Sequence, residues 1–161
     1  MTIIVEDNTG KLEANSYVSV DEVEKYLSLR GVEYDSEKLQ SLMILACDFI
    51  RGYSQRFYGK KLNENQGLDF PRVLGTKQID VPSDIKLAQI QLVKLQVELP
   101  EVFAAKTKDD FVIREKIDVL DLTYSESAFS ASNSANLRPI IDLIMQFGSN
   151  GYAGQFKAVR G

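Results

Sequence analysis

The sequence predicts a mainly α-helical protein: a small bundle of about four helices, with a minor β-hairpin and extended N- and C-terminal segments. Apolar residues recur at helical spacing through several long segments, and residues that start and stop helices stand at their ends. One later segment, residues 111–124, instead alternates between apolar and polar residues, as strands do. The 161 residues suit one domain, and 44% hydrophobic and 26% charged residues are ordinary for a globular protein.

The first two predicted helices follow an N-terminal arm, residues 1–18, whose apolar start at residues 2–5 is a strand or an extended segment. Ser19 and Glu22 fit a capping box, and Gly31 ends this first helix. The second is expected to run from Ser36, as its cap, to a stop at Gly59. Its apolar stripe is Leu39, Leu42, Met43, Ala46, Phe49, Ile50, Tyr53 and Phe57, with Gly52 marking a close contact or a slight bend.

The third predicted helix, residues 83–99, begins after Pro82 and ends before Pro100. It is apolar on most sides, so it lies either at the centre of the core or against a neighbouring subunit. The sequence leaves both alternatives open. The candidate subunit-interface residues are Ile85, Leu87, Ile90, Leu92, Val93 and Val97.

The character of the chain changes after the helical core, residues 19–100. Residues 101–135 are expected to hold the β-hairpin and a flexible polar loop. Residues 136–161 are expected to form a short helix that stops at Gly148, followed by a glycine-rich tail. These segments belong to a single predicted domain, 1–161.

The absence of histidine excludes the common catalytic and zinc-binding arrangements that need an imidazole. The single cysteine, Cys47, lies in an apolar run and is expected to be a buried hydrophobe. The acidic residues lack the spacing of a calcium loop. We therefore expect no enzyme activity, no cofactor and no metal.

Residues 49–61 interleave aromatic rings with four basic residues and contain no acid. Single-stranded nucleic acid is bound by this chemistry, since bases stack on rings and cations follow the phosphates. The rings at 49, 53 and 57 recur every four residues, however, which favours a buried stripe. Arg72 is a docking cation for a carboxylate or phosphate, or it hydrogen-bonds loop carbonyls. The candidate contact residues for DNA or a partner are Arg51, Arg56, Tyr58, Lys60, Lys61 and Arg72.

The charge balance and hydropathy bear on the partners. A net charge of −4 argues against affinity of the whole surface for nucleic acid or an anionic membrane, although a local basic patch can still exist. No apolar run approaches the roughly 20 residues that a membrane span needs. The N-terminus lacks the pattern of a secretory signal, so we expect an intracellular protein without membrane contact.

Two regions of the chain are similar to small neck proteins of tailed bacteriophages. The N-terminal region comprises Ile4–Asp7, Thr9-Gly10, Ala14–Ser19 and Tyr26 through Arg30-Gly31. The central region comprises Leu68–Arg72 with Val81-Pro82, Ile85-Lys86 and Ala88-Gln89. These proteins often carry the description DnaT-like single-stranded-DNA-binding protein. Asn8 replaces the usual glycine, and Phe70 replaces the usual tryptophan.

The resemblance implies a structural, non-enzymatic head-to-tail adaptor in the virion neck, made in the host cytoplasm. Its implied partners are a ring of twelve like subunits, the portal protein, tail or nozzle proteins, and double-stranded DNA passing through the lumen. The alternative is a DnaT-like replication accessory that binds single-stranded DNA through the 49–61 segment.

Overall fold

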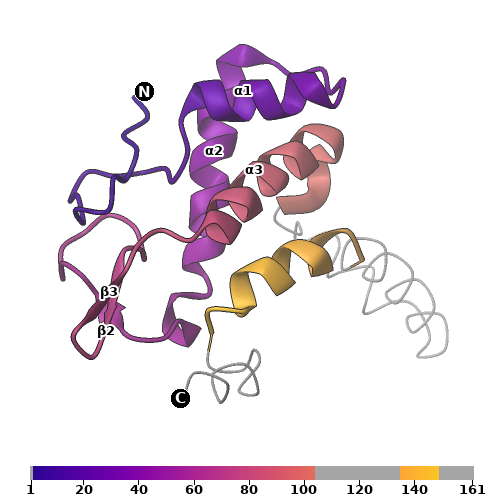
Figure 1. The fold of residues 1–161 in the computed structure, drawn as a ribbon. Coiled ribbons are helices and arrows are strands. Elements are labelled where there is room, and N and C mark those ends of the chain that lie inside the picture. Colours follow the sequence, from indigo (N-terminus) through magenta and orange to yellow (C-terminus); the bar gives the residue numbers. More distant parts are fainter. Residues whose placement is uncertain (1, 104–134, 149–161) are drawn as a thin grey trace, which may run out of the picture.

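The computed structural model describes residues 2–103 and 135–148, which form a mainly α-helical fold with a small antiparallel sheet (Figure 1). Its helical elements are α1 (Val20–Leu29), α2 (Ser36–Arg51), η1 (Ser54–Arg56), α3 (Ser83–Glu98), η2 (Pro100–Phe103) and a helix over residues 135–145. Its strands are β1 (Lys60–Lys61), β2 (Arg72–Leu74) and β3 (Lys77–Ile79), in the order β1-β2-β3. The predicted fold class is confirmed.

Helix α1 begins with the predicted capping box. The Ser19 hydroxyl accepts the Glu22 N–H at 3.2 Å, and the Glu22 carboxylate accepts the Ser19 N–H at 2.7 Å. Val23 and Leu27 are fully buried on its inner face. Gly31 follows the helix with φ +64°, a backbone conformation that glycine adopts without a Cβ penalty.

Helix α2 differs from the prediction at both ends. Its N-cap is Asp35, whose carboxylate accepts the Glu37 N–H at 3.0 Å, and not Ser36. It ends at Arg51, so the predicted continuation to Gly59 is wrong. Gly52 weakens helix formation there, and the N–H of Tyr53 bonds to the carbonyl three residues back, starting the tighter turns that lead into η1.

Helix α3 lies at the centre of the described residues, between α2 and the helix over residues 135–145 (Figure 1). Ile140 and Ile144 of that C-terminal helix belong to the same buried core as α3. In addition, Gln146 Nε2 donates to Asp84 Oδ2 at 2.8 Å. The chain therefore covers α3 with its own C-terminal helix.

This arrangement removes three of the six residues from the predicted subunit interface. Ile85, Leu92 and Val93 have no exposed surface, because they pack within their own chain. Leu87, Ile90 and Val97 are half-buried. Of the two alternatives for an apolar helix, the central position in the core is the one observed.

The sheet lies before α3, within the segment 19–100 that the sequence predicts to be a helical core. β1 and β3 both pair with β2, with Lys60 opposite Val73 and Val73 opposite Gln78. Strands of two or three residues are too short to show a clear alternation in the sequence. The predicted hairpin over 111–124 and the polar stretch over 125–135 lie outside the described residues, apart from position 135.

The N-terminal arm is fastened to the sheet and to α3. It makes a single bridge, Val5 to Ser16, in place of a strand over residues 2–5. The buried Glu6 carboxylate accepts the N–H groups of residues 10 and 11 at 2.9 Å each. Asn8 has φ +72°, and its side-chain oxygen accepts the Val81 N–H at 2.8 Å. None of the helices in the described ranges is long and apolar enough to cross a membrane.

Candidate nucleic-acid interface

The basic and aromatic segment, residues 49–61, forms the end of α2, the η1 turn and strand β1. Arg51, Arg56 and Lys60 are exposed. We call these three residues the basic surface. They lie at the end of α2, in η1 and in β1, three short elements that follow one another because the chain stops being an α-helix at Gly52.

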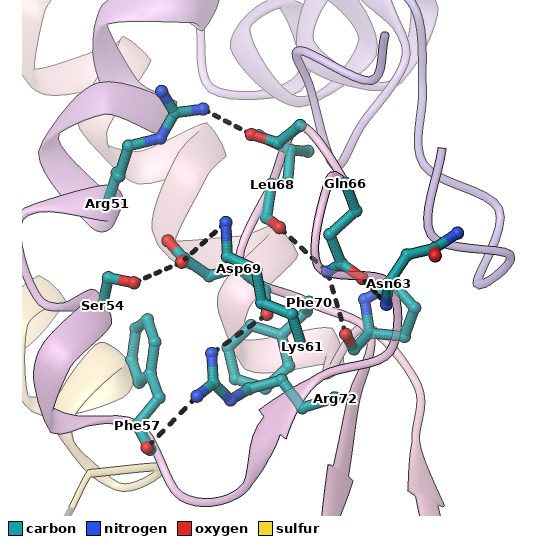
Figure 2. Close-up of polar contacts among 12 residues, drawn as sticks. Arg51, Ser54, Phe57, Lys61, Asn63, Gln66, Leu68, Asp69, Phe70 and Arg72 are labelled. Carbon is teal, nitrogen blue, oxygen red and sulfur yellow. Dashed lines mark hydrogen bonds and ion pairs between the residues drawn. The ribbon is translucent and has the colours of Figure 1, made fainter. Parts of the chain in front are cut away.

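The three basic side chains are held to different degrees. Arg51 Nη2 donates to the carbonyl of Gly67 (Figure 2). The Arg56 guanidinium lies 5.9 Å from the centre of the Tyr53 ring. The Lys60 side chain has no hydrogen-bond or ion-pair partner within residues 2–103 and 135–148, and its register with Val73 and Gln78 places it with these residues on one face of the sheet.

The aromatic residues of the segment divide into two groups. Phe57 is buried, with its ring centre 5.1 Å from that of Phe70, as the buried-stripe interpretation predicts. Tyr53 and Tyr58 are half-buried beside the basic surface, and the ring centres of Phe49 and Tyr53 are 5.7 Å apart. The two tyrosines are therefore partly exposed residues that neighbour the exposed cations in sequence.

Lys61 differs from its neighbour Lys60 because it belongs to a buried polar cluster (Figure 2). Its ammonium lies 3.8 Å from a carboxylate oxygen of Asp69, which is 1% exposed. The same carboxylate oxygen accepts the Ser54 hydroxyl. Asp69 thus connects η1 and β1 to the loop that precedes β2.

Arg72 is also part of this cluster, and its guanidinium is turned inward. Its Nε donates to the carbonyl of Tyr58 at 2.8 Å, and its Nη2 donates to the carbonyls of Gly59 at 2.7 Å and Phe57 at 3.4 Å. Its Nη1 donates to the Asp69 carbonyl at 3.3 Å. Arg72 is 6% exposed, and burial lowers its pKa from the ordinary arginine value while Asp69 opposes that change. The structure therefore resolves the two alternatives for Arg72 in favour of loop carbonyls.

Two further side chains brace the loop and were not predicted as site residues. The Tyr17 hydroxyl accepts the N–H groups of Asp69 at 3.1 Å and Phe70 at 3.4 Å. Gln66 Nε2 donates to the carbonyls of Leu68 and Pro71, each at 2.9 Å. The signal available in the sequence was the single acid, Asp69, between two large apolar residues. We call Asp69, Ser54, Lys61, Arg72, Tyr17 and Gln66 the buried cluster.

The C-terminal helix returns the chain to this same region. After the helix, Gly148 forms an antiparallel bridge with Phe57, and the Tyr58 N–H donates to the Phe147 carbonyl at 3.0 Å. A Cβ at Gly148 would lie 3.2 Å from the Arg56 carbonyl oxygen, so the two backbones approach closely. The last described residue is therefore in contact with the segment that carries the basic surface.

No other chemical site was found in the described part of the chain. It contains no group of three or more His, Cys, Asp or Glu side chains that could hold a metal ion. Cys47 is buried, and burial raises the pKa of its thiol to about 12. A thiol with this pKa is protonated near neutral pH and is a poor nucleophile.

The fold and this surface define a small, mainly α-helical domain whose exposed cations and tyrosines suit a binding role. A family model described as "Putative DnaT-like ssDNA binding protein" matches residues 1–161, so the chain belongs to this family. Neither a curated protein nor a solved structure matches the chain.

The family match corrects the leading prediction from sequence. The head-to-tail adaptor of a virion neck, with its twelve-subunit ring, portal and tail partners and double-stranded DNA in a lumen, is wrong, because the matched family is described by single-stranded-DNA binding. The predicted virion location is wrong for the same reason. The alternative drawn from the same resemblance, DnaT-like binding of single-stranded DNA, is the one that the comparison supports.

Proposed function

We propose that this protein binds single-stranded DNA through the basic surface, Arg51, Arg56 and Lys60, with Tyr53 and Tyr58 as stacking rings. The observation that carries the proposal is the gathering of three exposed cations and two half-buried tyrosines on an acid-free segment. The described function of the family supports the same ligand.

The chemistry of the surface fits a flexible, unpaired strand. Cations that neutralise phosphates release bound counterions, and exposed ring faces stack with bases of any sequence. The net charge of −4 gives the protein no general attraction for DNA, so affinity has to come from a local surface. The buried cluster links Ser54 of η1 and Lys61 of β1 through Asp69, and so it fixes the two elements that carry Arg56 and Lys60.

The proposal is one of binding without catalysis. The sequence contains no histidine, and its only cysteine is buried with a raised pKa. No histidine is therefore present to activate a water molecule, and the Cys47 thiol is not placed to attack a phosphate. The basic surface offers positive charge, and Tyr53 and Tyr58 offer rings for stacking. Together these are sufficient for binding.

The test is a titration of a fluorescently labelled oligothymidine strand, followed by anisotropy over a series of salt concentrations. The variant combines Arg51→Ala, Arg56→Ala and Lys60→Ala. Because these substitutions remove three cations that would each neutralise a phosphate, the slope of log affinity against log salt should fall by about 2. At low salt we expect affinity to fall at least ten-fold.

The matched control removes three exposed basic residues in α1, at its C-cap and in the first turn of α2: Lys25→Ala, Arg30→Ala and Lys38→Ala. It changes the net charge by the same amount, far from the basic surface (Figure 1). Equal losses in both triple variants would show that only overall charge matters. Failure of the unchanged protein to bind the strand would refute the proposed function.

A further inference from the structure

The three strands of the sheet carry no acidic residue. They include four cations, Lys60, Lys61, Arg72 and Lys77, although the whole chain has more acidic than basic residues, 23 against 19. Lys61 and Arg72 belong to the buried cluster, and Lys60 belongs to the basic surface. The fourth cation, Lys77, is exposed and belongs to neither group. Within residues 2–103 and 135–148, its ammonium has no hydrogen-bond or ion-pair partner.

The hairpin of β2 and β3 ends in an exposed tip. Leu74 pairs with Lys77 across a turn formed by Gly75 and Thr76. The Leu74 side chain is 45% exposed. A Cβ on Gly75 would meet no described atom within 4 Å, so the turn extends into open space. We call Leu74 and Lys77 the hairpin tip.

The hairpin tip adjoins the segment that carries the proposed binding site. A Cβ on Gly59 would collide with the carbonyl of Val73 and would lie 3.4 Å from the backbone nitrogen of Leu74. The two backbones therefore touch at this point. Gly59 stands between Tyr58 and Lys60, which are a stacking ring and a cation of the proposed function.

The strand register determines how far apart the two exposed lysines are. Lys60 is opposite Val73, and Val73 is opposite Gln78, the residue after Lys77. Neighbouring strands are about 4.8 Å apart, so the backbones at Lys60 and Lys77 are roughly 10 Å apart. Side chains alternate along a strand, which places these two lysines on opposite faces near the end that carries the turn. Asp80, the acid that follows β3, lies beyond its other end and accepts a hydrogen bond from Gln78 Nε2 at 3.0 Å.

We propose that the hairpin tip is a second contact for the DNA strand, with Lys77 neutralising a phosphate and Leu74 packing against a base or sugar. The strand leaves the basic surface and passes around the end of the sheet. DNA is assigned to this surface because its exposed charge is positive and because it adjoins the basic surface at Gly59. This inference rests on the proposed function and adds a surface to it.

The experiment titrates a labelled oligothymidine strand, long enough to extend beyond the basic surface, over a series of salt concentrations. Lys77→Ala should lower the slope of log affinity against log salt by about 0.7, since one phosphate contact is lost. Lys77→Arg keeps the charge and should keep the slope. Leu74→Ala should keep the slope but weaken binding about three-fold, the effect of burying roughly 25 Å² less apolar surface.

The matched controls take the same two residue types from α1, which lies at the opposite end of the fold from β2 and β3 (Figure 1). Leu29 is 75% exposed, and Lys25 is exposed. Lys25→Ala and Leu29→Ala should each keep affinity within about two-fold of the unchanged protein, because a distant charge is screened and a distant leucine touches no DNA. Thermal unfolding of every variant establishes that the fold is retained. Lys77 has no partner to lose, so its variants test the contact even where Leu74→Ala loosens the hairpin.

The outcomes separate this inference from the proposed function. If the unchanged protein binds and Lys77→Ala keeps the full salt slope, the hairpin tip is not a contact and the basic surface stands. Equal losses in the hairpin variants and the α1 controls would also overturn the inference. A lowered slope for Lys77→Ala together with full affinity for Leu74→Ala would overturn the role of Leu74. If the unchanged protein does not bind the strand, both proposals fail together.

Discussion

The basic surface and the buried cluster come from the same short stretch of chain, yet they use their cations in opposite ways. Arg51, Arg56 and Lys60 are exposed, whereas Arg72 is 6% exposed and Lys61 pairs with a buried carboxylate. Arg72 donates to four backbone carbonyls and Lys61 pairs with Asp69, so these two cations fix the loop. Arg56 and Lys60 remain available to a ligand, whereas Arg51 also donates to the Gly67 carbonyl. Residue type alone does not distinguish a cation that fixes the loop from one that can contact a ligand. The burial of its side chain does.

The largest effect that tests this difference is expected from Arg72→Ala. The substitution leaves four carbonyl oxygens, at residues 57, 58, 59 and 69, without their guanidinium donor. Buried acceptors left without donors are costly, so the free energy of unfolding should fall by about 3–5 kcal/mol. Chemical denaturation measures this change.

Arg72→Lys is the control, because it keeps the positive charge but not the fork that reaches several carbonyls. It should recover only a minor part of the lost stability. Affinity for DNA, measured under conditions where the variant is folded, should stay within two-fold. A stable Arg72→Ala variant that no longer binds DNA would contradict the structural role.

A sharper test of the same comparison uses the adjacent lysines, which are matched in type and position. Lys61→Ala removes the ammonium that pairs with the buried Asp69 carboxylate, although Arg72 still interacts with that charge. The change should cost about 1–2 kcal/mol, since Lys61 is 32% exposed and solvent weakens the pair. Lys60→Ala should change stability by less than about 0.5 kcal/mol. Denaturation and DNA titration are carried out on both variants.

For DNA binding we expect the opposite ranking, with a larger effect for Lys60→Ala than for Lys61→Ala. Lys60→Ala should lower the salt slope by about 0.7, the value for one phosphate contact on a single strand. Lys61→Ala should lower it by less. The same change in slope for both lysines would mean that Lys61 leaves Asp69 to contact the strand.

The smallest effect is expected at an exposed ion pair whose side chains belong to neither region. Lys11 and Thr9 hold the pKa of Asp7 at about 2, below its ordinary value of 3.8. A lowered pKa in the folded state means that the charged form stabilises the fold above pH 3.8, and that this contribution is lost as the pH falls towards 2. Melting temperatures of the unchanged protein and Asp7→Asn should differ slightly above about pH 4 and converge near about pH 2. A constant difference over this range would show that the charge of Asp7 is not involved.

The regular parts of the fold could be predicted from the sequence because their signals are local. The capping box of Ser19 and Glu22 and the continuous apolar pattern of α3 each identify an element without knowledge of distant residues. The end of α2 was placed too late because Phe57 keeps the helical spacing. Its burial arises instead from a turn that brings it against Phe70.

The buried cluster could not be predicted because its partners are far apart in the chain. Tyr17 and Asp69 are separated by 52 positions, and no periodicity connects them. The cover over α3 was missed for a related reason. An apolar helix shows that something covers it, but the sequence does not say whether the cover is another subunit or residues 135–145 of the same chain.

The placement of the tyrosines also has an optical consequence. The chain has seven tyrosines and no tryptophan, so its ultraviolet emission comes from tyrosine. Tyr17 is 1% exposed, with its hydroxyl held by two backbone N–H groups, and it lies where no strand can stack on it. Tyr53 and Tyr58 are half-buried and are the stacking rings of the proposed function. If that proposal holds, a stacked base should quench their emission but not that of Tyr17, so an unlabelled strand can be titrated by the loss of tyrosine fluorescence.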